Sequence, residues 1–107
     1  MSRNRFMRVI VMFDLPVTTI KQQRAYRTFR KWLIKSGFIM MQQSIYSKVM
    51  LNPTAAKFLI MQIKNNSVDE GLIQVMTITE SQYAGIECII GSSTSEVVSD
   101  MRRLVIL

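Results

Sequence analysis

The segment from Phe6 to Leu15, FMRVIVMFDL, constrains the fold of this chain more than any other stretch. It is rich in β-branched and aromatic residues, it is too short for a buried helix, and Pro16 follows it directly. Such an apolar run is typical of a central strand that is covered on both faces. The run ends on a carboxylate, Asp14, which is a candidate turn former, metal ligand or catalytic group.

A helix is predicted next, over TTIKQQRAYRTFRKWLIKSGF. Thr18 or Thr19 is a suitable N-cap, and Gly37 stands where helices commonly end. At about 100° per residue, the apolar and aromatic side chains share one arc that we expect to pack inward. These side chains are Ala25, Tyr26, Phe29, Trp32 and Leu33.

The rest of the chain continues an alternation of strands and helices. Residues 38–51 predict either two short strands or one bent strand, and Asn52 with Pro53 predicts the start of a second helix. Residues 72–80 predict a strand, and residues 85–91, GIECIIG, predict another, shorter one. The order indicates one α+β domain over residues 1–107, with a ferredoxin-like βαββαβ fold and both helices on one face of an antiparallel sheet.

The open face of such a sheet needs a cover. Because the first strand is apolar on both faces, a second copy of the chain is a suitable cover, which predicts a homodimer. Residues 102–107 predict an extra C-terminal strand, which either adds to the partner's sheet or pairs within its own. Its apolar residues are Leu104, Val105, Ile106 and Leu107.

Charge points to a polyanionic partner. The chain has 14 Lys and Arg against 7 Asp and Glu, a net charge of +7, so nucleic acid is the first candidate. With no histidine and one cysteine, Cys88, the chain has no Ser-His or Cys-His pair, no internal disulfide and no His-ligated zinc. No run approaches the ~20 apolar residues of a membrane span, so we expect a cytoplasmic protein without a membrane partner.

A basic stripe is predicted on the outer face of the first helix. Lacking acidic neighbours three or four positions away, it fits a track for phosphate oxygens better than a solvated, salt-bridged face. Its members are Lys21, Arg24, Arg27, Lys31 and Lys35, with Arg30 beside them. Arginines near both ends of the chain extend the predicted patch: Arg3, Arg5, Arg8, Arg102 and Arg103.

Asp14 leaves two interpretations open. An Asp that ends a strand before a proline is commonly a turn former, since its side chain bonds nearby backbone amides. Alternatively, two copies of Asp14 across a two-fold axis would share a Mg²⁺ and support phosphodiester hydrolysis. No other carboxylate stands at a spacing that forms a recognisable pair with it.

Four segments together resemble the Cas-two family of CRISPR-associated proteins, especially the version found with type II systems. They are VIVMFDLP, RAYRTFRKWLIKSGF, MMQQSIYSKV and VMTITESQYAGI, and the likeness covers nearly the whole chain. The resemblance implies a ferredoxin-like dimer whose C-terminal strand adds to the partner's sheet. It also implies spacer acquisition, in which the dimer holds a double-stranded DNA prespacer and bridges subunits of the Cas-one integrase.

The same family is described as metal-dependent endoribonucleases, some of which cut double-stranded DNA. The residue implicated matches Asp14, and Phe13 stands where many relatives have tyrosine. Two hypotheses follow: a DNA-binding adaptor, ranked first, and a Mg²⁺-dependent nuclease acting on RNA or DNA through Asp14. A third hypothesis is a metabolite-binding regulatory domain. The sequence gives it less support, because it contains no glycine-rich ligand loop.

Overall fold

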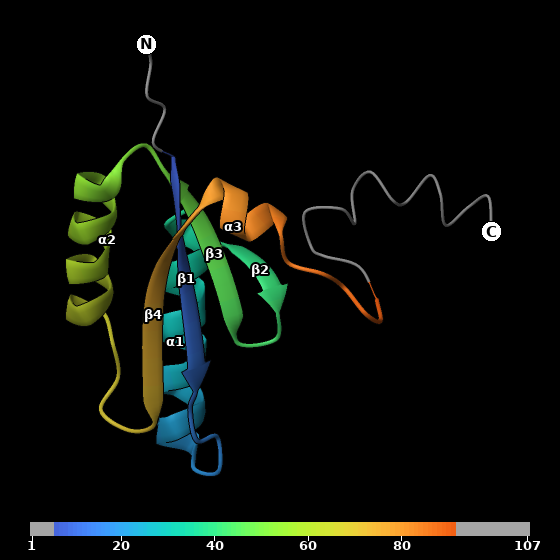
Figure 1. The fold of residues 1–107 in the computed structure, drawn as a ribbon. Helices are drawn as coiled ribbons and strands as arrows, with labels where there is room; N and C mark the ends of the chain where they lie inside the picture. Colours follow the sequence, from blue (N-terminus) through green and yellow to red (C-terminus); the bar gives the residue numbers. More distant parts are fainter. Residues whose placement is uncertain (1–5, 92–107) are drawn as a thin grey trace.

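The computed structural model describes residues 6–91, whose strands form one antiparallel sheet in the order β2-β3-β1-β4 (Figure 1). The elements along the chain are β1 (Met7–Asp14), α1 (Ile20–Lys35), β2 (Ile39–Gln42), β3 (Ile45–Met50), α2 (Pro53–Asn65), β4 (Leu72–Thr79) and α3 (Glu80–Ala84). The predicted α+β class and antiparallel sheet are therefore confirmed. The predicted C-terminal strand, residues 102–107, lies outside the described residues.

The hydrophobic core lies between one face of the sheet and the helices α1 and α2. Alternation along β1 sends Val9, Val11 and Phe13 to this face, where they are almost fully buried. Helix α1 contributes Phe29 and Leu33 to the same cluster. Helix α2 contributes Ala56, Leu59 and Ile63. Both helices thus cover one face of the sheet, as the pattern of the sequence predicts.

Phe13 stands at the centre of an aromatic cluster that joins β1 to α1 and β3. Its ring centroid lies 5.2 Å from that of Phe29 and 5.8 Å from that of Tyr26, both in edge-to-face geometry. On its other side it stacks on Tyr46 at 5.7 Å. Such pairs add about 0.5–1.5 kcal/mol each beyond area burial, so this cluster fixes α1 firmly over the sheet.

Local signals explain where the helices begin and end. Thr19 caps α1, and its Oγ1 accepts a hydrogen bond from the Gln22 amide at 3.0 Å. Asn52 caps α2 by accepting from the Ala55 amide at 2.8 Å. Gly37 follows α1 with a φ of +98°, a conformation that L side chains rarely adopt. These three predictions are confirmed.

The predicted strand over residues 85–91 is wrong. The structure has no strand over these residues: a short helix, α3, begins directly after β4 and ends at Ala84, just before them. Its start is a capping box, in which Thr79 Oγ1 accepts from the Gln82 amide and Gln82 Oε1 accepts from the Thr79 amide. The following segment is irregular as far as Gly91, and Ile89 and Ile90 are 85% and 93% exposed.

The sheet face opposite α1 and α2 is mainly apolar and, within residues 6–91, is crossed only by α3 at one end (Figure 1). We call this side the open face. The strand register places three rows of mainly apolar side chains on it, and each row also contains one polar residue: Arg8, Ser47 or Gln74. The apolar members of the open face are Ile10, Met12, Ile39, Ile45, Val49, Met76 and Ile78. Met76 and Val49 are 45% and 42% exposed, so this face presents large apolar side chains to solvent.

Within the described part of the chain, no helix has both the length and the apolar character needed to cross a membrane.

Candidate nucleic-acid interface and the Asp14 position

The outer face of α1 carries a row of cations, as the helical periodicity predicts. The aromatic arc anchors the opposite side of the helix, since Phe29 and Leu33 are 1% and 0% exposed. All six cations of the helix are exposed: Lys21, Arg24, Arg27, Arg30, Lys31 and Lys35. We call this set the basic face of α1. It extends along the full length of the helix.

Within residues 6–91 the cations of this face form no ion pair, although Asp69 and Glu70 lie near its N-terminal end, beside Lys21. No acidic residue occurs in α1, and the ion pair found within residues 6–91 joins Arg8 to Glu80, away from the helix. Unpaired Arg and Lys side chains at one surface attract phosphate oxygens and release counterions on binding. The face therefore has the electrostatics of a site for a polyanion.

The structure corrects the prediction that Arg8 extends this patch. Arg8 lies on β1, and its side chain is 15% exposed. Its Nε donates to Glu80 Oε2 at 2.7 Å, and its guanidinium carbon lies 3.9 Å from the centre of the Tyr83 ring. Arg8 therefore anchors α3 to the sheet and is not free to bind phosphate. The other four predicted arginines, Arg3, Arg5, Arg102 and Arg103, lie outside the described residues.

Asp14 is the last residue of β1 and its side chain is exposed. It pairs with Leu72 of β4. Because side chains alternate along a strand, Asp14 shares a row with Ile10 and Met12 and lies on the side of the open face. A second copy stacked on that face would approach Asp14 from this side.

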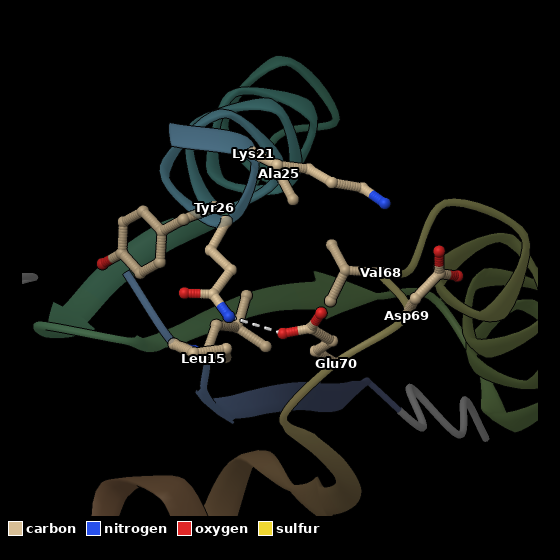
Figure 2. A pocket seen from close by; sticks show the side chains of 9 residues that line it. Leu15, Lys21, Ala25, Tyr26, Val68, Asp69 and Glu70 are labelled. Atoms are coloured by element: carbon tan, nitrogen blue, oxygen red, sulfur yellow. Dashed lines mark hydrogen bonds between the residues drawn. The ribbon is translucent and has the colours of Figure 1, made fainter. Parts of the chain in front are cut away.

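Asp14 does not belong to a cluster of metal ligands within residues 6–91. Of the two acids in the loop before β4, Asp69 and Glu70, the second contacts α1 instead. Figure 2 shows Glu70 accepting a hydrogen bond from Gln22 Nε2, at 2.6 Å, across a small cavity. This cavity, of about 60 Å³, has room for a few waters but not for a nucleotide.

A hollow on the surface of α1 was not predicted. It lies among the cations of the basic face and is lined by Trp32 together with Arg24, Arg27, Thr28, Lys31 and Lys35. The helical periodicity assigned Trp32 to the inward arc, yet its side chain is only half-buried. The sequence contained a signal for this partial exposure, because Trp32 lies at the border of the apolar arc and directly follows Lys31.

The predicted swapped strand, Leu104, Val105, Ile106 and Leu107, lies outside the described residues. The structure therefore places two of the predicted features, the basic face of α1 and Asp14 at the end of β1. It does not bring them together, because Asp14 belongs to the side of the sheet that faces away from α1.

Comparison with known proteins identifies the family. The sequence profile described as "CRISPR associated protein Cas2" matches residues 7–86. The chain is 52% identical over 101 residues to the "CRISPR-associated endoribonuclease Cas2" of Treponema denticola, covering 94% of this chain and 100% of that protein. It is 42% identical over 101 residues to the protein of the same name from Streptococcus mutans, covering 94% and 93%.

A solved structure described as "Crystal structure of cas2" has the same fold. It superimposes with a TM-score of 0.56 over 86% of this chain and 94% of its own, at 18% sequence identity. The profile match and the relatives cover most of the chain, so the resemblance seen in its four sequence motifs is confirmed. The chain belongs to the Cas2 family of CRISPR-associated proteins.

Proposed function

We propose that this protein is an adaptor of CRISPR adaptation, which binds prespacer duplex DNA by its backbone and bridges subunits of the Cas-one integrase. The observation that carries the proposal is the basic face of α1. Its six exposed cations lie on one helix that contains no acidic residue. Contacts of Lys and Arg with phosphates hold a duplex without selecting its sequence, which suits a protein that must accept varied prespacers.

The adaptor acts as a homodimer in this proposal, with a single domain over residues 1–107. The open face supports it, since Met76, Val49 and Ile39 are exposed apolar side chains on this one face, where a second copy would cover them. Residues 102–107 would add as a strand to the partner's sheet. A dimer also doubles the basic face, which lengthens the track for a duplex.

The salt dependence of duplex binding tests the proposal. Replacing Arg27 and Lys31 by alanine should lower the affinity for a labelled random-sequence duplex. It should also flatten the slope of log K against log salt by about two units, since each lost phosphate contact removes about 0.9. An unchanged slope would remove these residues from the footprint. Lys57→Ala with Lys64→Ala, on exposed positions of α2, is the charge-matched control.

A second candidate function is a metal-dependent nuclease that cleaves RNA through Asp14. Two relatives of this chain are named endoribonucleases, which favours it. The fit of Mg²⁺ to one protomer is poor, because Asp14 has no group of further ligands within residues 6–91. The candidate therefore needs the second Asp14 of a dimer. A shared Mg²⁺ would supply the Lewis acid for phosphodiester hydrolysis.

The variant Asp14→Asn separates the two functions. If the protein is an adaptor, the variant dimer mixed with its cognate integrase integrates prespacers as the wild type does. If Asp14 acts as a metal ligand, the same variant loses cleavage of labelled RNA in the presence of Mg²⁺. Loss of integration by a folded, dimeric variant would contradict the adaptor proposal in which Asp14 has no direct task.

A further inference from the structure

Trp32 is the only tryptophan of the chain and lies inside the basic face of α1. It lines a surface hollow together with Arg24, Arg27, Thr28, Lys31 and Lys35. Thr28 and Lys35 are its neighbours one helical turn away on either side, and such neighbours have Cβ atoms about 5–6 Å apart. An aromatic ring therefore occurs among four cations at one surface.

The indole is held from below by the core. Its ring centroid lies 6.4 Å from that of Phe29, with 22° between the planes. Phe29 is 1% exposed and packs edge-on against Phe13 at 5.2 Å. The buried aromatic cluster thus fixes the orientation of the indole. Because the ring is already ordered, packing a ligand on it costs little side-chain entropy.

We infer that Trp32 is the stacking platform for an unpaired nucleobase of a bound nucleic acid, whose phosphates contact the flanking cations. This inference rests on the proposal that α1 binds nucleic acid, and it adds a contact with an unpaired base to the contacts with the duplex backbone. A base in the middle of a duplex is already stacked on both sides. Only a base that is single-stranded, at a frayed end or extruded can reach the indole.

Charge and chemistry favour this occupant over others. Four cations without an acidic residue on the helix attract an anionic partner. A cationic groove that contains an aromatic side chain is the usual composition of surfaces for single strands, since every base has a face that stacks. An acidic peptide would satisfy the cations but would leave the aromatic ring without a matching partner.

Because Trp32 is the sole tryptophan, its fluorescence reports on this site alone. The full-length protein is titrated with three probes of equal length: oligothymidylate, the same backbone made entirely of abasic nucleotides, and a blunt duplex. We expect strong quenching by oligothymidylate and little by the other two, although anisotropy shows that all three bind. Equal quenching by the abasic strand, or by polyglutamate, would overturn the inference, because phosphates or carboxylates alone would then explain the signal.

Variants give an independent measurement. Trp32→Leu keeps an apolar side chain against Phe29 but removes the stacking surface, so single-strand affinity should fall at least about fivefold. Trp32→Phe should retain a larger share of that affinity, and blunt-duplex affinity should be unchanged in both. The control is Phe58→Leu, which removes an exposed ring from α2. Urea denaturation identifies any variant whose loss comes from unfolding.

The outcomes distinguish a failure of this inference from a failure of the proposal that α1 binds nucleic acid. If Arg27→Ala with Lys31→Ala leaves the salt dependence of binding unchanged, the basic face is not the nucleic-acid site and both fall. If that double variant flattens the slope while Trp32→Leu binds single strands as the wild type does, only the stacking role of Trp32 is overturned.

Discussion

Arg8 and Glu80 form an ion pair that fastens the short helix α3 to the central strand β1. The Nε of Arg8 donates to Oε2 of Glu80 at 2.7 Å, and the two residues are 72 positions apart in the chain. The guanidinium also lies over the ring of Tyr83, which is one turn further along α3. This contact holds α3 against one end of the open face.

We expect Arg8→Met to lower the free energy of unfolding by about 1–2 kcal/mol. A hydrogen bond to a charged group and a cation–π contact are both lost, and the effect is reduced because Glu80 is 38% exposed. Urea denaturation measures it. Arg30→Met is the matched control and should change stability by less than about 0.5 kcal/mol. Equal losses in the two variants would contradict a stabilising role for the pair.

Position 71 requires glycine, because its backbone lies too close to the main chain at Asp14 for a side chain to fit. Its φ is +99°, and a Cβ built there would lie 2.7 Å from the carbonyl oxygen of Asp14. Gly71→Ala should therefore destabilise the protein by about 2 kcal/mol or more, because the backbone must shift and the left-handed conformation is strained. Gly85→Ala, at a φ of −82° with 3.4 Å to its nearest atom, should be within about 0.5 kcal/mol of wild type by thermal denaturation.

Sequence patterns predicted the parts of the fold that depend on neighbours along the chain. The bounds of α1 follow from Thr19 and Gly37, and its two faces follow from the periodicity between them. The strand predicted over residues 85–91 was wrong because its isoleucines favour strands, whereas the capping signal from Thr79 to Gln82 starts a helix just before them. That signal was available in the sequence.

The candidate site was predictable to the same extent. The exposure of the basic face could be derived from the spacing of its cations, but the pairing of Arg8 with Glu80 could not. Contacts between residues 72 positions apart leave no local pattern. The half-buried position of Trp32 likewise depends on how far Phe29 and the sheet reach beneath it, which only the packed structure defines.

The cap of α2 gives a third prediction, on stability. The side chain of Asn52 accepts a hydrogen bond from the Ala55 amide at 2.8 Å, which satisfies a donor that the helix leaves unpaired. Asn52→Ala should cost about 1 kcal/mol, and Asn52→Gly only a few tenths. The same substitution at exposed Asn65, the last residue of α2, should have little effect on the urea midpoint. No difference between Asn52→Ala and Asn52→Gly would argue against the cap.

The open face gives the final prediction, on assembly. If two copies pack through this face, Met76→Lys places an unpaired charge in an apolar interface and should raise the dimer dissociation constant at least about tenfold, or 1.4 kcal/mol. Met76 is 45% exposed in the protomer, so the monomer should remain folded. Phe58→Lys, on the outer side of α2 at a residue 64% exposed, is the matched control and should leave the dimer intact. Sedimentation velocity over a range of concentrations distinguishes the variants. If Phe58→Lys weakens the dimer and Met76→Lys does not, the interface lies on α2 and not on the open face. A second Asp14 would then approach from the α2 side.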